Sequence, residues 1–348
     1  MKVLYLFTSY RGEALEKAKR GDDHGNGFWG MLHLSRFGIT AEYLEPEHFY
    51  SKKISLLIRK YMGVYWLHLS FFFKFFSYDV VFTSTAFGTQ LVHTLLHIKK
   101  PKWVMHDFSI MGLIGKEETL RQKVFAYMVR HCAGIVTLAE DEKERLEERF
   151  PNLRGKVECI PYGVDLTFFA PTPTPEEDII YSPGRDPDRD YSTLFKAAEG
   201  FGIPVIVTTS APRLKKFNPL PSFVEVKDYS IKEYVNAYRR ARVVVIPLDI
   251  SSGLNNAMGF SVLQESLAMG KAIIATRTGT TETYITHGEN GLLVPGKDPE
   301  VLKMAIERLL NDHALRERLE RNARAYAEAH LGVDRLTERL AAFFRRVA

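Results

Sequence analysis

The feature that most constrains the fold is an alternation of short apolar runs with helical patterns. In the first half of the chain the apolar runs are Val3–Phe7, Val80–Thr83, Trp103–Met105 and Gly134–Leu138. Helical patterns lie between them, for example at Trp29–Phe37 and Gln90–Ile98. This alternation predicts parallel strands that are joined by crossover helices.

The same alternation restarts in the second half, after a cluster of Pro and Thr residues between Pro161 and Pro175 that is typical of a linker. The second set of apolar runs is Ile179–Tyr181, Val205–Thr208, Val243–Pro247, Ala272–Ala275 and Leu292–Val294. After Pro299 the pattern is helical to the end. We therefore expect an α/β protein with two doubly wound domains at 1–165 and 166–330 that face a cleft, followed by a final helix at 331–348.

Composition narrows the class of protein. The net charge of +5 is compatible with anionic ligands or lipid headgroups but does not indicate a nucleic-acid partner. The two cysteines, Cys132 and Cys159, have no metal-ligand spacing and predict neither a disulfide framework nor a zinc site. The N-terminus is interpreted as a first strand, not as a secretory signal, and a cytoplasmic location is expected.

A carboxylate, Glu265, lies on the helix that follows the run Val243–Pro247. Ser261 and Gln264 fit a capping box, so we expect the helix to begin at Ser261. Backbone N–H groups at Gly259, Phe260 and Ser261 would then form an anion site suited to a diphosphate. Glu265 would lie one turn further along and bind a vicinal diol, as acidic residues do for ribose. The alternative is that Glu265 only complements the helix dipole.

A second group of charged residues follows the run Ile179–Tyr181, in the sequence SPGRDPDRDY. Gly184 allows close backbone approach, and Arg185 and Arg189 can bind phosphate oxygens. The alternative is a solvated charge cluster, because three Asp residues neutralise the same segment. Both groups fall at the carboxyl ends of strands, where ligands bind in open α/β sheets.

Residues from about 157 to 329 resemble the C-terminal domain of family 4 glycosyltransferases. The resemblance rests on PYGVD at Pro161–Asp165, on GRDPDRDY, and on GFSVLQESLAMGKAIIATRTGTTETYITHGENGLLV. It implies the GT-B fold of two Rossmann-like domains, with the final helix at 331–348 packing back on the first domain. It also implies that Arg185 and Arg189 hold the donor diphosphate, that Glu265 binds the ribose, and that the backbone of Gly259–Ser261 meets the donor. One departure is Ala257, which stands where the family has a first glutamate near the transferred sugar.

The resemblance further implies transfer of a sugar from a nucleoside diphosphate sugar with retention of anomeric configuration, without a cofactor or a metal. The acceptor would be a carbohydrate or a lipid-linked molecule, as in cell-envelope or polysaccharide biosynthesis. Two other activities remain open: a nucleotide-sugar epimerase of the same fold, and a non-catalytic module that binds a sugar nucleotide. The nearest acidic motif, Asp186–Asp188, lies inside the arginine loop and is not expected to hold a metal.

The first domain offers fewer candidate residues. His106 stands at the carboxyl end of an apolar run, where the family often has a histidine near the transferred sugar; a simple polar residue at a strand end is the alternative. Asp107 can orient His106 or cap the next helix. On the acceptor side we expect His24, Gly25 and Gly27, in the place of the family's glycine-rich loop, unless this segment is an ordinary flexible loop.

The segment from Ile54 to Asp79 is rich in aromatic residues and also carries Arg59, Lys60 and Lys74. Its charges make it unsuitable as a transmembrane span. A helix with basic and aromatic faces can lie on an anionic membrane, which would place the chain peripherally at the inner face of the membrane. The equal alternative is that these rings pack in the core of the first domain.

Overall fold

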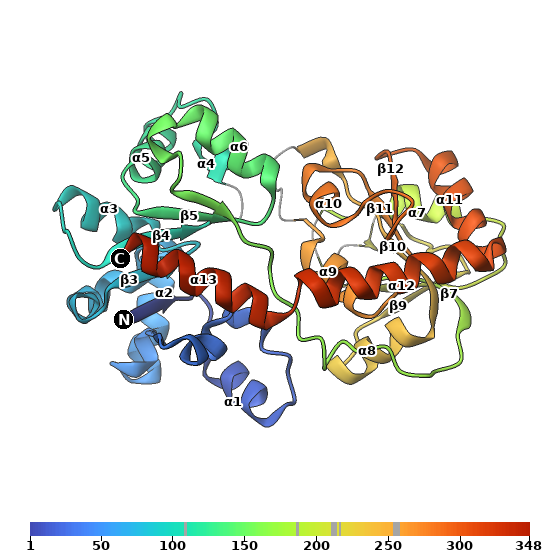
Figure 1. Ribbon diagram of the computed structural model, residues 1–348, viewed down its shortest axis with the longest axis horizontal. Helices are drawn as coiled ribbons and strands as arrows, with labels where there is room; N and C mark the ends of the chain where they lie inside the picture. The colour runs from blue at the N-terminus through green and yellow to red at the C-terminus, as the bar shows by residue number, and fades with distance from the viewer. Residues whose placement is uncertain (108–109, 186–187, 210–213, 216, 253–257) are drawn as a thin grey trace. The chain divides into compact units, whose positions relative to one another are not determined.

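The computed structural model describes residues 1–348 apart from 108–109, 186–187, 210–213, 216 and 253–257 (Figure 1). Its internal contacts divide the chain into two compact units. Unit 1 comprises Met1–Gly163 together with Val333–Ala348, and unit 2 comprises Val164–Gly332. The sequence analysis placed these divisions after residues 165 and 330.

Unit 1 is built on a six-stranded parallel sheet in the order β2-β1-β3-β4-β5-β6. Its strands are β1 (Lys2–Leu6), β2 (Thr40–Tyr43), β3 (Val80–Thr83), β4 (Lys102–His106), β5 (Gly134–Thr137) and β6 (Val157–Cys159). The four central strands correspond to the four apolar runs of the first half. The two edge strands, β2 and β6, were not predicted.

Side chains of β1 alternate between two apolar clusters, one on each face of the sheet. Leu4 and Leu6 belong to a cluster with α3 and α5, whereas Val3 and Tyr5 belong to a cluster with η2 and α13. Such burial of both faces is typical of parallel sheets.

The helical elements of unit 1 are α1 (Gly12–Arg20), η1 (Asn26–Phe28), η2 (Met31–Phe37), η3 (Pro46–His48), α2 (Lys52–Trp66), η4 (Leu67–Ser77), α3 (Phe87–Leu95), α4 (Ile110–Ile114), α5 (Leu120–Arg130), α6 (Glu140–Arg149), η5 (Pro151–Leu153) and α13 (Val333–Val347).

The last helix, α13, completes the core of unit 1 (Figure 1). Phe343 and Phe344 are fully buried on it, and a β-carbon at Gly134 would lie 2.6 Å from the Phe343 ring. The absence of a side chain at Gly134 therefore makes room for this ring. The helical pattern at Trp29–Phe37 corresponds to the 3-10 helix η2 over Met31–Phe37, which begins two residues later than the pattern because Trp29 and Gly30 both have positive φ.

Unit 2 has a second six-stranded parallel sheet, in the order β12-β11-β10-β7-β8-β9. Its strands are β7 (Glu177–Ser182), β8 (Val205–Thr208), β9 (Val224–Lys227), β10 (Ala241–Ile246), β11 (Ile273–Thr276) and β12 (Leu292–Val294). Its helical elements are α7 (Tyr191–Ala198), α8 (Ile231–Arg240), η7 (Ile250–Ser252), α9 (Phe260–Ala268), α10 (Gly279–Tyr284), α11 (Pro299–Asn311) and α12 (His313–His330). Both units are doubly wound, which confirms the fold class expected from the sequence.

Candidate functional site

The strand order of unit 2 reverses between β7 and β10. From β7 the chain proceeds outward through β8 to β9, and from β10 it proceeds the other way through β11 to β12. Loops that leave two such neighbouring strands diverge to opposite faces of the sheet, which opens a crevice at their carboxyl ends. The loop after β7 carries Gly184, Arg185 and Arg189, and the segment after β10 leads to Gly259 and Glu265. The topology therefore brings both predicted donor-binding groups to the same edge.

Helix α9 begins one residue before the position that the sequence indicated. Its N-cap is Gly259, which has φ of 71°, and no side-chain hydrogen bond caps the helix. The expected capping box of Ser261 and Gln264 is therefore wrong, because Ser261 already lies inside the helix. The first bond of the helical ladder joins Leu263 N–H to Gly259 O at 2.9 Å, so the N–H groups of Ser261 and Val262 precede that ladder.

Gly184 lies where the loop after β7 meets the start of α9. It has φ of 109°, and a β-carbon there would collide with Nη2 of Arg189 and lie 3.0 Å from Cγ2 of Val262. Arg189 in turn pairs with Leu248, just after β10, in an isolated β-bridge. Only a glycine allows this close approach of loop, guanidinium and helix. Gly184, Arg189 and the first turn of α9 are thus brought together.

The two arginines of the loop lie in different surroundings. Arg189 is buried, with 4% of its surface exposed, and Asp190 beside it caps α7 through a hydrogen bond from Thr193 N–H. Arg185 is exposed and forms an ion pair with Asp228, which follows the edge strand β9. Exposed pairs of this kind are worth at most about 1 kcal/mol, so Arg185 can exchange Asp228 for an anionic ligand at low cost.

Glu265 is 7% exposed and accepts hydrogen bonds from two tyrosines of α8. Its Oε2 lies 2.7 Å from the Tyr234 hydroxyl and 3.3 Å from the Tyr238 hydroxyl. Burial, followed by the Glu265 charge, raises the pKa of both hydroxyls well above its usual value, so they remain donors. These tyrosines were not predicted from the sequence. Their i, i+4 spacing places them on one face of α8 and was the available signal.

In unit 1, His106 ends β4 and is buried beneath aromatic rings. Its ring centroid lies 4.7 Å from that of Trp29 and 5.3 Å from that of Phe82. Burial lowers the pKa of His106 to about 3, so the imidazole is neutral in ordinary buffers. Asp107 accepts a 2.6 Å hydrogen bond from Ile110 N–H, which is the capping role that the sequence suggested.

Of the expected acceptor-side residues, His24 and Gly25 lie in a turn just before η1, and Gly27 lies within η1. Nδ1 of His24 accepts a hydrogen bond from Asn26 N–H at 3.2 Å, and Gly25 has φ of 65°. A β-carbon at Gly27 would lie 3.1 Å from Nη1 of Arg11. The positive φ of Gly25 favours a glycine in the turn itself, whatever ligand the turn meets, whereas at Gly27 only the end of the Arg11 side chain would have to shift.

The segment Ile54–Asp79 divides between the two alternatives for its aromatic residues. Leu67, Phe71 and Phe75 of η4 are buried in the core of unit 1, whereas Tyr61 on α2 is 75% exposed. Core packing therefore explains these three buried residues, but not Tyr61 or the exposed Phe73 and Phe76 of η4. In the described part of the chain, no helix is both long and apolar enough to cross a membrane.

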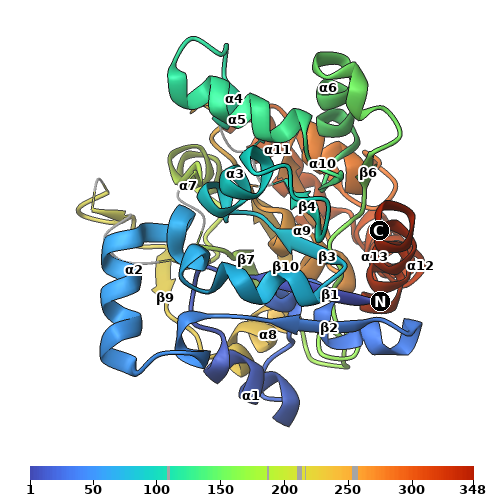
Figure 2. The ribbon, with the colours of Figure 1, turned by 90° about the vertical axis from the view of Figure 1, so that its left-hand side faces the viewer.

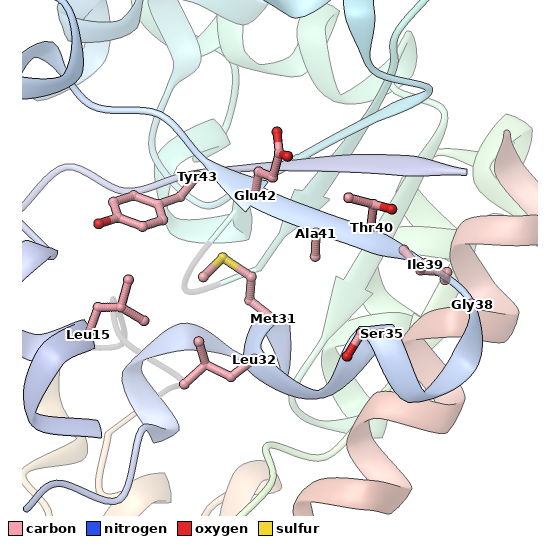
Figure 3. Close-up of a pocket in the computed structure, with 10 residues that line it drawn as sticks. All are labelled: Leu15, Met31, Leu32, Ser35, Gly38, Ile39, Thr40, Ala41, Glu42 and Tyr43. Carbon is pink, nitrogen blue, oxygen red and sulfur yellow. The ribbon is translucent and has the colours of Figure 1, made fainter. Parts of the chain in front are cut away.

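A cavity of about 700 Å³ lies elsewhere in unit 1, between α1, η2 and the edge strand β2 (Figure 3). Leu15, Met31 and Leu32 form its apolar side. The carboxylate of Glu42, on β2, accepts a hydrogen bond from the Tyr78 hydroxyl. No residue expected at the donor or acceptor site lines it.

Over the residues that the structure describes, no cluster of three or more His, Cys, Asp or Glu side chains is arranged to hold a metal ion. Asp186 and Ala257 lie outside those residues.

Comparison with known proteins supports the resemblance of the second half of the chain to glycosyltransferases. Residues 224–326 match the family described as Glycosyl transferases group 1. The chain is 40% identical over 126 residues to a D-inositol 3-phosphate glycosyltransferase of Acidothermus cellulolyticus, which covers 33% of this chain and 26% of the relative. It is 23% identical over 304 residues to the enzyme of that name from Nocardiopsis dassonvillei, covering 74% and 64% respectively. The chain thus spans less than two thirds of the length of these relatives.

Solved structures resemble the chain over its whole length. Sucrose-phosphate synthase from Thermosynechococcus elongatus has a TM-score of 0.73 at 17% identity, covering 100% of this chain and 99% of that one. Anabaena HepE in complex with UDP-glucose has a TM-score of 0.70 at 14% identity, covering 99% and 100%. This likeness establishes the fold and confirms the expected GT-B architecture. Residues 224–326 thus match a glycosyltransferase family in sequence, within a chain whose fold is that of glycosyltransferases.

Proposed function

We propose that the chain is a glycosyltransferase that moves a sugar from a nucleoside diphosphate sugar to an acceptor. The observation that carries the proposal is the meeting of Gly184, buried Arg189 and the start of α9 at the point where the strand order of unit 2 reverses. A guanidinium and backbone N–H groups at a helix N-terminus are suited to a diphosphate. Glu265 lies one turn further along α9, within reach of a ribose bound to that diphosphate.

The role proposed for these groups in catalysis is to stabilise the leaving group. The bond between the anomeric carbon and the phosphate oxygen breaks as the acceptor oxygen forms its own bond to that carbon, and negative charge develops on the diphosphate. Arg185, Arg189 and the positive end of the α9 dipole would stabilise this charge without a metal. Assignment to family 4 and retention of configuration are part of the proposal, with a departing phosphate oxygen accepting the proton of the acceptor.

In unit 1 we assign His106 to the side of the transferred sugar and His24, Gly25 and Gly27 to the acceptor. Since burial holds the pKa of His106 at about 3, its contribution would be a hydrogen bond and not a charge. The proposed acceptor is a carbohydrate or a lipid-linked molecule. With a lipid-linked acceptor the chain would work as a peripheral protein at the inner face of a membrane.

Calorimetry with UDP, GDP and ADP tests donor binding directly. Glu265→Gln should weaken the preferred nucleotide by 10-fold or more, because hydrogen bonds to a charged group contribute about 1.5–3 kcal/mol. Glu300→Gln, at an exposed position on α11 of the same unit, is the matched control and should bind as the wild type does. Equal affinities for all three proteins would refute the assignment of Glu265.

Incubation with a panel of nucleotide sugars then separates transfer from other activities. Transfer or slow donor hydrolysis that persists in EDTA supports the metal-independent mechanism, and NMR of the product reports its anomeric configuration. A changed donor sugar in the absence of acceptor would identify an epimerase instead. Tight nucleotide binding with no reaction across the panel would indicate a binding module.

A further inference from the structure

The exposed half of the aromatic segment belongs to a larger surface of unit 1. On α2, Ile54, Leu57 and Tyr61 follow each other at i, i+3 and i+7 and are all exposed. Residues at this spacing share one face of a helix. Helix α2 lies at the outer edge of unit 1 (Figure 2). A helix that turns an apolar stripe toward solvent needs a partner for that stripe, because large exposed apolar patches mark interaction sites.

The same helix, α2, leads on to an apolar groove. A bend at Gly63, which has φ of 61°, ends the regular helix, and Trp66 beyond it lines the groove between α2, α3 and α5. The Trp66 ring lies against α3 at Gly88, where a β-carbon would come within 2.4 Å of the ring atoms. The groove has a volume of about 400 Å³ and its walls are almost entirely apolar. Leu120, at its rim, is 79% exposed. We call the α2 stripe and this groove together the α2–α5 surface.

The charged residues within the elements of the α2–α5 surface are all positive. The four elements that form it and support it, namely α2, η4, α3 and α5, contain eight Lys and Arg residues and no Asp or Glu. Since the whole chain carries only +5, these elements hold more than its entire positive excess. Acidic partners come from outside them: Glu47 binds Arg59, and Glu117 binds Arg130.

Cations and rings are also paired side by side on these elements. Nζ of Lys60 lies 5.4 Å from the Tyr61 ring centroid, and Nζ of Lys74 lies 5.3 Å from that of Phe73. Arg121 lies over Phe125 at 5.6 Å and donates to the Tyr65 hydroxyl at 3.3 Å. An exposed ring with a cation beside it matches a membrane interface, where the ring enters the acyl boundary and the cation meets lipid phosphates.

We propose that the α2–α5 surface docks on an anionic lipid bilayer, with the α2 stripe and Leu120 in the acyl boundary and the flanking Lys and Arg on lipid phosphates. The uniform positive charge favours this partner over a second copy of the chain, because two such surfaces would repel each other. The inference deepens the proposed function by naming where the chain would meet a lipid-linked acceptor. Docking itself requires neither nucleotide nor acceptor.

Flotation with vesicles tests the proposal. The wild-type chain should float with vesicles of phosphatidylcholine containing one third phosphatidylglycerol and stay unbound with phosphatidylcholine alone. Lys53→Glu/Lys60→Glu should weaken binding by about 25-fold or more, from about fivefold for each Lys removed. Leu57→Asp/Tyr61→Asp should abolish flotation while the protein remains folded, because both side chains are exposed and the substitutions cost only about 1 kcal/mol of helix stability. Met304→Asp, at an exposed position in unit 2, is the matched control and should float as the wild type does.

Three results would overturn the proposal. They are the absence of flotation with anionic vesicles at low salt, equal flotation of the Leu57→Asp/Tyr61→Asp and Met304→Asp variants, and a dimer in sedimentation that Leu57→Asp/Tyr61→Asp dissociates while no vesicle binding occurs. Calorimetry with nucleotides on the same proteins keeps this inference apart from the proposed function. A chain that floats but binds no nucleotide supports the docking surface and refutes donor binding. A chain that binds nucleotide but does not float supports donor binding and refutes the docking surface.

Discussion

The contact between Gly184 and Arg189 yields the sharpest prediction. Gly184→Ala places a β-carbon where φ is 109°, a conformation that costs a residue other than glycine about 1–2 kcal/mol. The new methyl group must also displace the Arg189 guanidinium and crowd Val262 at 3.0 Å, which adds about 1–3 kcal/mol by overpacking. The expected loss in the free energy of unfolding is thus about 2–5 kcal/mol. Because Arg189 is displaced, nucleoside diphosphate affinity should fall by about 10-fold or more.

Gly200→Ala separates the cost of the positive φ from the cost of displacing neighbouring side chains. Gly200 has φ of 90° in the same unit, but no atom lies within 4 Å of a β-carbon there. This variant should therefore lose only about 1–2 kcal/mol and bind nucleotide as the wild type does. Urea unfolding gives the free energies, and calorimetry at a temperature where both variants are folded gives the affinities. A Gly184→Ala protein that binds nucleoside diphosphate as tightly as Gly200→Ala would refute the role given to Arg189.

Three further predictions concern buried hydrogen bonds and protons. Tyr234→Phe removes the 2.7 Å bond to Glu265 and should weaken nucleotide binding by about 3- to 10-fold in calorimetry while leaving the fold intact, since the 3.3 Å bond from α8 remains. Burial lowers the pKa of His68 to about 4. The neutral ring therefore contributes on the order of 3 kcal/mol to the free energy of unfolding above pH 6.5, and this contribution should be lost as the pH falls toward 4. In urea titrations, His68→Gln should make the free energy of unfolding less dependent on pH in this range. Burial raises the pKa of Glu320 to about 7. The protonated side chain therefore contributes to the free energy of unfolding below pH 4.5, and this contribution is lost as the pH rises to 7. Glu320→Gln should remove this pH dependence, which is opposite in sign to that of His68.

The strands show how far the pattern of the sequence reaches. Every strand with neighbours on both sides was predicted, because its side chains are buried on two faces and read as a continuous apolar run. Three edge strands were missed, at Thr40–Tyr43, Val157–Cys159 and Val224–Lys227. Their sequences TAEY, VEC and VEVK mix polar and apolar residues, because an edge strand is partly covered by solvent. Pairing at an edge is set by the neighbour and not by the strand's own pattern.

The candidate site was predictable from the sequence at positions whose backbone conformation favours a single residue type, glycine. Gly184 and Gly259 were identified in this way, and both have positive φ. The start of α9 was not predictable, because Ser261 and Gln264 satisfy the capping pattern while the glycine two residues earlier takes the cap. Tyr234 was missed because its bond to Glu265 joins residues 31 apart. Only the fold of unit 2 brings α8 and α9 together.

The return of α13 to unit 1 also affects the order in which a nascent chain can fold. Translation delivers all of Val164–Gly332 before it delivers the helix that carries Phe343 and Phe344. Unit 2 can therefore fold while the first sheet still exposes the apolar face that these rings cover. During that interval the uncovered face around Tyr5 and Phe82 is prone to aggregation, and unit 1 can complete its core only after α13 has left the ribosome.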